Sequence, residues 1–171
     1  MPRLQTRPYV KPDVDGTAKM RSSDFLTEYD YGQTVKAPGR SQYAFQTANG
    51  MVYTVNLKRD FDVDHQSQLI ISFTTTDPKT RKSTNARTGT GDSVAIFRTV
   101  QKVLLDYLRS LPKEQLPDQL IFIADGTDPG RIKLYSNIAH SNRIPGYKFY
   151  HSSESDPSDT QVIFVMQRIL T

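Results

Sequence analysis

A glycine-rich turn leads directly into a long amphipathic helix pattern, and this junction constrains the fold more than any other stretch of the chain. The turn reads Thr-Gly-Thr-Gly-Asp over residues 88–92. Apolar residues then recur at spacings of three and four, which predicts a helix that buries one face against a core. We expect this helix to end near Ser110, with an inner stripe of Val94, Phe97, Val100, Leu104 and Leu108.

The same junction is a candidate anion site. Gly89 and Gly91 allow the backbone to approach a ligand closely. The first helical turn has N–H groups without partners inside the helix, and the helix dipole favours negative charge there. We therefore predict that Gly89, Gly91 and the N–H groups from Ser93 to Ala95 hold a phosphate. The alternative is a tight turn that only caps the helix, with Asp92 as N-cap.

Composition sets the protein class. The chain has 171 residues, of which 36% are apolar and 23% charged, as in ordinary soluble globular proteins. It contains no cysteine, so disulfides, thiolate nucleophiles and cysteine metal sites are excluded. A net charge of +4 permits an anionic partner without requiring one. No apolar run approaches the roughly 20 residues of a membrane span, and we expect a cytoplasmic protein.

The chain divides into an arm and a domain. Prolines and glycines interrupt residues 1–40, and their apolar residues show no sustained period. We predict that residues 1–40 form an extended arm with one short helix near Ser23–Tyr29. Residues 41–171 form the domain.

Strand and helix patterns alternate through the domain. Asn49-Gly50 lies between two β-rich runs, which predicts a hairpin. A third apolar run follows over residues 68–76, and the three strands suggest an antiparallel meander. After the long helix come a buried strand over residues 120–124, a helix beginning at Asp128-Pro129, and two final strands. The predicted fold is α/β, with a mixed sheet and the order β-β-β-α-β-α-β-β.

This order, with a glycine turn opening the first long helix, resembles the GNAT-type N-acetyltransferase fold over residues 42–168, and is similar to small GNAT-like proteins of bacteriophages. In that family a Gln/Arg-x-x-Gly-x-Gly/Ala loop holds the pyrophosphate of acetyl-CoA. Gly89 and Gly91 match its glycines, whereas Ala86 stands at the Gln/Arg position and Arg87 follows it. The resemblance implies that Gly89, Gly91, Asp92 and Ser93 lie at the pyrophosphate and that Arg87 adds charge.

A second match lies in the later helix, where Tyr135 follows an apolar residue and Gly146-Tyr147 opens the next strand. In the family such a tyrosine protonates the departing thiolate of CoA, and the resemblance gives this role to Tyr135. A neutral hydroxyl suits the task because it donates to a developing anion. The alternative is a core tyrosine on the inner stripe of Ile132, Tyr135, Ile138 and Ala139.

The general base of the family is missing from its usual place. Residues 70–76 contain no acidic side chain, and the first carboxylate after them is Asp77. A base must come within hydrogen-bond or one-water reach of the amine. Asp77, Asp125 and Glu154 remain candidates if folding brings them there, and an amine that arrives deprotonated needs no base.

The resemblance therefore implies a protein that binds acetyl-CoA and transfers acetyl to an amine, without a metal. The alternative is a non-catalytic GNAT-fold protein, such as a phage virion or host-interaction component, that docks to a protein partner or larger assembly through its arm. Its place would be the host cytoplasm or the virion. A third, weaker hypothesis is nucleic-acid binding through Lys79, Arg81, Lys82 and Arg87, a loop without stacking aromatics.

Overall fold

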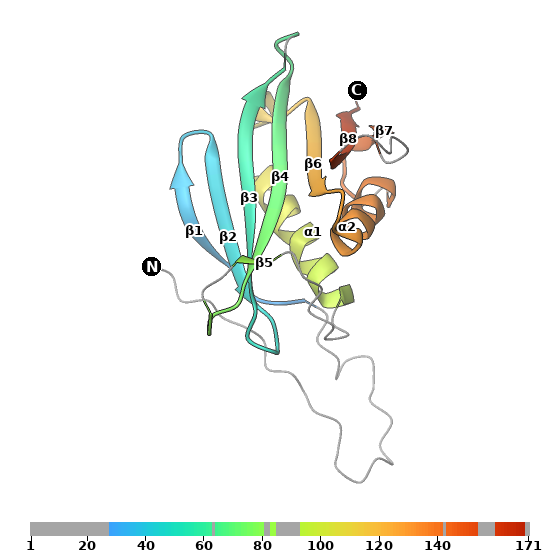
Figure 1. Cartoon of the computed structure of the whole chain (residues 1–171). Coiled ribbons are helices and arrows are strands. Elements are labelled where there is room, and N and C mark those ends of the chain that lie inside the picture. Colours follow the sequence, from blue (N-terminus) through green and yellow to red (C-terminus); the bar gives the residue numbers. More distant parts are fainter. Residues whose placement is uncertain are drawn as a thin grey trace, which may run out of the picture.

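The computed structural model describes residues 28–62, 64–80, 83–84, 93–141, 143–153 and 160–169, which form a mixed sheet with two long helices (Figure 1). In chain order the elements are β1 (Gly32–Ala37), β2 (Arg40–Gln46), β3 (Val52–Phe61), β4 (Ser67–Thr76), β5 (Ser83–Thr84), α1 (Ser93–Ser110), the short 3-10 helix η2 (Lys113–Gln115), β6 (Gln119–Asp125), α2 (Pro129–His140), β7 (Tyr147–Ser152) and β8 (Gln161–Arg168).

The strands lie in the order β1-β2-β3-β4-β6-β8-β7, and β5 pairs with β4. Strands β1 to β4 form the predicted antiparallel meander with one strand added at its start. Among the described strands, β4 and β6 form the parallel pair, and α1 makes the connection between them. A parallel connection needs such a crossover element. The β4–β6 seam therefore joins the meander to the C-terminal half of the sheet.

The predicted α/β class with a mixed sheet agrees with the structure, but the predicted order lacks two strands. Strand β5 falls in the loop that carries Lys79, Arg81, Lys82 and Arg87, and β1 falls within the segment expected to be an arm. The Pro38-Gly39 turn closes the β1–β2 hairpin, with Gly39 at φ +72°, a value that favours glycine. Strand β1 lies at the edge of the sheet and its residues are half-buried or exposed, so it shows little apolar pattern. Residues 1–27 lie outside the described residues, as does most of the predicted Ser23–Tyr29 helix.

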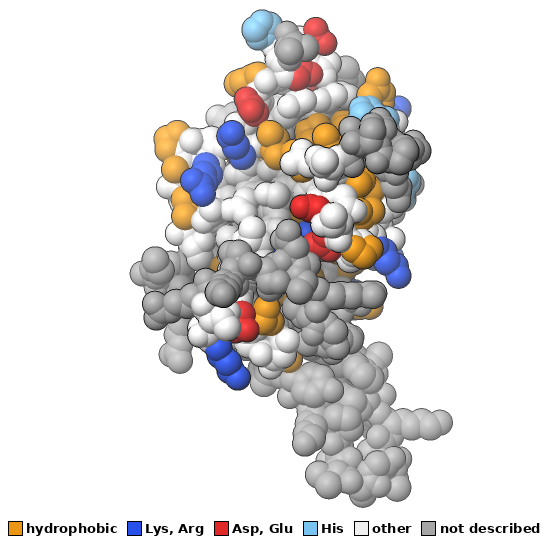
Figure 2. Space-filling model, viewed as in Figure 1, with side chains coloured by type: hydrophobic (Ala, Val, Ile, Leu, Met, Phe, Trp, Pro, Cys, Tyr) orange, Lys and Arg blue, Asp and Glu red, His pale blue; other side chains and the backbone are white. Residues whose placement is uncertain are grey.

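One face of the sheet carries the hydrophobic core. Alternate residues of β3, β4 and β6 are buried on this face, and they form one cluster with buried residues of both helices. The predicted stripe of α1 is wrong at its first position, because Val94 is 60% exposed. The stripe begins instead at Ala95 and Ile96 and continues through Val100, Val103, Leu104 and Leu108. Figure 2 shows the molecular surface in the view of Figure 1.

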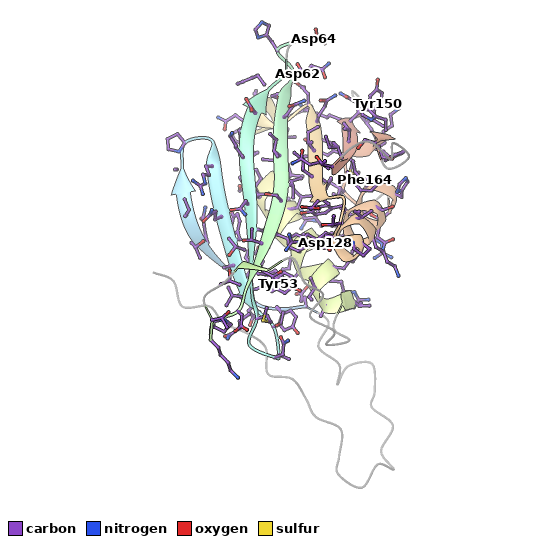
Figure 3. The ribbon with its side chains drawn as sticks, viewed as in Figure 1. Tyr53, Asp62, Asp64, Asp128, Tyr150 and Phe164 are labelled. Carbon is purple, nitrogen blue, oxygen red and sulfur yellow. The ribbon has the colours of Figure 1, made fainter. Side chains whose placement is uncertain are left out.

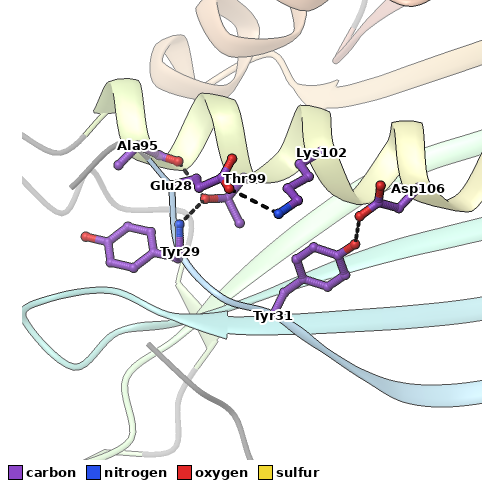
Figure 4. A network of polar contacts seen from close by, with 7 residues as sticks. All are labelled: Glu28, Tyr29, Tyr31, Ala95, Thr99, Lys102 and Asp106. Carbon is purple, nitrogen blue, oxygen red and sulfur yellow. Dashed lines mark hydrogen bonds and ion pairs between the residues drawn. The ribbon is translucent and has the colours of Figure 1, made fainter. Parts of the chain in front are cut away.

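Hydrogen bonds and an ion pair hold residues 28–31 against α1 (Figure 4). The Tyr29 N–H donates to the Thr99 hydroxyl at 2.7 Å, Lys102 pairs with Glu28 at 3.0 Å, and Tyr31 donates to Asp106. The Tyr29 ring is 1% exposed and stacks on Phe45 with ring centroids 5.7 Å apart. The segment directly before β1 therefore belongs to the core. In the part of the chain that the structure describes, no helix is long and apolar enough to cross a membrane.

We predict that Tyr29→Ala lowers the free energy of unfolding by about 3–5 kcal/mol, because it removes a large buried ring and leaves a cavity. Urea unfolding followed by circular dichroism measures the change. Tyr150→Ala is the control, since Tyr150 is 61% exposed and its removal should cost no more than about 0.5 kcal/mol. Equal stability of the two variants would show that residues before β1 do not anchor the domain.

Candidate functional site

The backbone pairing between the parallel strands β4 and β6 ends about halfway along each strand. Their pairing runs from Gln68 opposite Gln119 to Ile71 opposite Phe122. Strand β4 continues to Thr76 and β6 to Asp125 without further pairing between them. The carboxyl-terminal ends of these strands therefore separate, at the end of the sheet where both α1 and α2 begin.

The N-cap and the first turns of α2 place three polar side chains beside the separated strand ends. Asp128, Arg131 and Tyr135 are separated by three and four residues, so they lie along one face of the helix. The Asp128 carboxylate caps the helix by accepting from the Arg131 backbone N–H at 3.1 Å, and Pro129 occupies the first turn. Figure 3 places Asp128 beside the end of β6. The predicted helix start is confirmed.

The Tyr135 ring packs against side chains of both strands near the point where the strands separate. Its centroid is 5.5 Å from that of the Phe73 ring on β4 and 5.4 Å from that of the Phe122 ring on β6. The side chain is fully buried. The phenolic oxygen lies near the Phe73 backbone, but the geometry falls short of a hydrogen bond, and no other described residue partners it.

Burial keeps the Tyr135 hydroxyl protonated. Desolvation disfavours the phenolate and raises the pKa of Tyr135 far above its ordinary value of 10. The Arg131 guanidinium nearby acts in the opposite direction, but its effect on the pKa is smaller. This hydroxyl is therefore a neutral donor throughout the physiological pH range.

Arg131 bridges α2 and β4 across the gap. Its guanidinium donates to the Thr75 hydroxyl at 3.2 Å and lies 4.4 Å from the centroid of the Phe73 ring. Its Nε is 3.5 Å from Asp128 Oδ2, which makes an ion pair within α2. Asp128 Oδ2 nevertheless accepts no hydrogen bond from the described residues, although it is buried.

Two buried polar atoms on one face of α2 thus have no hydrogen-bond partner among the described residues. They are Asp128 Oδ2, which keeps its ion pair with Arg131, and the Tyr135 hydroxyl oxygen. A buried polar group without a hydrogen bond costs folding free energy, and native proteins contain few of them. Their presence together beside the parted strands points to a site for a polar ligand.

The structure places one of the predicted site residues in this site. Tyr135 is there, and its ring packs in the core as the alternative interpretation expects. Its role as a proton donor to CoA stays a prediction. Ser93 begins α1, as the helix pattern predicts. Arg87, Gly89, Gly91 and Asp92 lie outside the described residues, and their contact with a phosphate stays a prediction.

None of the described contacts brings a candidate base, Asp77 or Asp125, to Tyr135. Asp125 is exposed at the end of β6, where its carboxylate accepts from the Thr127 N–H at 2.8 Å and the Thr127 hydroxyl at 2.6 Å. These hydrogen bonds hold the pKa of Asp125 below its usual range, which weakens it as a base. Asp77 accepts from the Lys79 N–H in a similar turn. Glu154 lies outside the described residues.

Sequence reasoning missed Arg131 and Thr75 as parts of the site. The spacing of Asp128, Arg131 and Tyr135 was available as a signal, since it predicts a common helix face. The contact with Thr75 was not, because it joins residues 56 apart in the chain. Among the described residues, no group of three or more His, Asp or Glu side chains could hold a metal ion.

We predict that Tyr135→Phe leaves the free energy of unfolding unchanged or raises it by up to about 1 kcal/mol, because the lost hydroxyl is buried and no described residue forms a hydrogen bond with it. Chemical denaturation measures the change.

The matched control is Tyr147→Phe. The Tyr147 ring is also buried, but its hydroxyl donates to the Pro117 carbonyl at 2.6 Å. Removing that donor should cost about 1–2 kcal/mol. A loss of stability in Tyr135→Phe as large as in Tyr147→Phe would mean that the Tyr135 hydroxyl has a partner in the folded protein.

No protein-family model and no curated protein matches the chain. Among solved structures, a crystal structure of a candidate phosphinothricin N-acetyltransferase is similar at 15% sequence identity and a TM-score of 0.38. The match covers 79% of this chain and 71% of that one. A likeness at this level assigns neither a family nor an activity to this chain.

Proposed function

We propose that the protein is a GNAT-like acyltransferase that binds acetyl-CoA at the gap between β4 and β6 and transfers the acetyl group to an amine. The observation that carries this proposal is the buried Tyr135 hydroxyl, which has no hydrogen-bond partner among the described residues and lies where the two parallel strands separate. A protonated donor held in a dry, preformed position is suited to a leaving group that develops negative charge.

The chemistry assigns Tyr135 one step. Acetyl-CoA supplies an activated thioester, and the amine nitrogen forms a bond to its carbonyl carbon while the carbon–sulfur bond breaks. Tyr135 gives its proton to the departing sulfur. The amine nitrogen loses a proton when the amide forms, and this proton restores the Tyr135 hydroxyl. Burial keeps the hydroxyl in its protonated form, in which it can donate to the developing thiolate.

The glycine turn would hold the other end of the same ligand. We infer that Gly89, Gly91, Asp92 and Ser93 bind the pyrophosphate, the last three through backbone N–H groups, and that Arg87 adds positive charge. The support is the glycine pattern in the sequence and the start of α1 at Ser93, at the end of the sheet where α2 also begins. No metal takes part in this proposal.

We propose that the acceptor binds as a neutral, deprotonated amine. Asp77 and Asp125 are each engaged in a local turn, and the described part of the site offers no other carboxylate except Asp128, which is paired with Arg131. We propose an intracellular setting for the reaction.

A second function is favoured by the complete burial of Tyr135. A GNAT-like scaffold that has lost catalysis would keep this side chain as a core residue and act through protein contacts. The chain would then serve as an interaction or virion component that docks through its N-terminal residues, alone or in a larger assembly.

We predict saturable binding of acetyl-CoA in calorimetry, and a free energy of unfolding raised by about 2.7 kcal/mol when the ligand is present at 100 times its Kd. Gly91→Trp should abolish the binding, because the indole would occupy the place of the pyrophosphate. Absence of both heat and stabilisation at millimolar acetyl-CoA would contradict the first function and favour the second.

We predict that Tyr135→Phe binds acetyl-CoA within about twofold of the wild type but turns over on the order of 10²-fold more slowly with a panel of primary amines. Release of the free CoA thiol measures the rate. The wild-type rate should rise with pH as the amine loses its proton and should show no decline below about pH 10, since the raised pKa of Tyr135 keeps its hydroxyl protonated. Unchanged turnover in Tyr135→Phe would remove Tyr135 from the reaction.

A further inference from the structure

The side chains of the site are buried, so a ligand can reach Tyr135 only if part of the site moves. Tyr135 and Thr75 are buried, and the Arg131 side chain is only 11% exposed. The following inference rests on the proposed function, because a hydroxyl that acts on acetyl-CoA must first become accessible. A side chain near Tyr135 must therefore move.

Arg131 is the described side chain that ties α2 to β4 at this position. It lies one helical turn before Tyr135, and both side chains contact the same ring, that of Phe73. Its hydrogen bond to Thr75 reaches β4 four residues beyond Ile71, the last residue of that strand that pairs with β6. The Arg131 contacts thus join α2 to β4 where the backbone pairing of β4 with β6 has ended.

The described contacts of Arg131 are of two kinds, one within α2 and the others between α2 and β4. The ion pair with Asp128 lies within α2, so Arg131 keeps its counter-ion when it leaves β4. The contacts with Thr75 and Phe73 join two different elements, so a movement of Arg131 away from β4 would break both of them. Breaking a buried ion pair is costly because it leaves an uncompensated charge, and a movement that keeps the Asp128 pair avoids that cost.

We propose that Arg131 is a gate for this site. In the closed state its guanidinium lies on Phe73 and binds Thr75, and Tyr135 is sealed. In the open state the guanidinium leaves β4, remains beside Asp128, and gives acetyl-CoA access to Tyr135.

Thr75→Val tests the gate with little change in shape. It replaces the hydroxyl that accepts from Arg131 by a methyl group and leaves Arg131 and Asp128 in place. Arg131→Ala is less informative, since it leaves the buried Asp128 carboxylate without its counter-ion and endangers folding. Thr74→Val is the matched control, because Thr74 is the neighbouring residue, is exposed, and undergoes the same chemical change.

Two readouts are needed in the full-length protein. The first is hydrogen–deuterium exchange of residues 72–76 and 129–135 without ligand. The second is the association rate of acetyl-CoA in stopped flow. Loss of one hydrogen bond should raise the open population, and with it both quantities, by about fivefold in Thr75→Val and leave them unchanged in Thr74→Val.

The outcomes separate the gate from the proposed function. Faster exchange in Thr75→Val together with no binding of acetyl-CoA by the wild type would support the gate and remove the proposed function. Exchange that is the same in Thr75→Val and Thr74→Val would overturn the gate, whatever the ligand does.

Discussion

The end of pairing between β4 and β6 after Ile71 and Phe122 is the constraint on which the rest of this structure depends. While the strands pair, they join the antiparallel meander to the C-terminal strands through their parallel seam. Once they separate, side chains must fill the space between them. Tyr135 does so with its ring against Phe73 and Phe122, and Arg131 does so with its contact to Thr75.

This filling is chemically unusual. A core built for stability alone would place apolar side chains between the strands, since a buried hydroxyl or carboxylate oxygen without a partner costs folding free energy. Instead, the gap contains the Tyr135 hydroxyl and is lined by the Asp128–Arg131 pair. Natural proteins retain such costs where function requires them. The physical evidence for a site is therefore the pair of buried oxygens, on Asp128 and Tyr135, that have no hydrogen bond among the described residues.

Local structure was predictable from the sequence to the extent that it depends on neighbouring residues. Asn49-Gly50 indicated the β2–β3 hairpin, and Asp128-Pro129 indicated the start of α2, because turn and cap chemistry act over a few residues. Strand β1 was missed because a half-buried edge strand shows little apolar pattern, and Val94 was misplaced because three- and four-residue spacing fits more than one helix face. The gap between β4 and β6 and the Arg131–Thr75 contact depend on the pairing of distant segments, which no local pattern contains.

The most direct test of this account is an NMR titration of the isotopically labelled protein with acetyl-CoA, which locates the binding site without assuming a reaction. We predict that the largest shift changes fall on the unpaired ends of the two strands, residues 72–76 and 123–125, and on α2 between Asp128 and Tyr135. Shift changes confined to the β1–β2 hairpin or to the opposite face of the sheet, or none at saturating ligand, would contradict it.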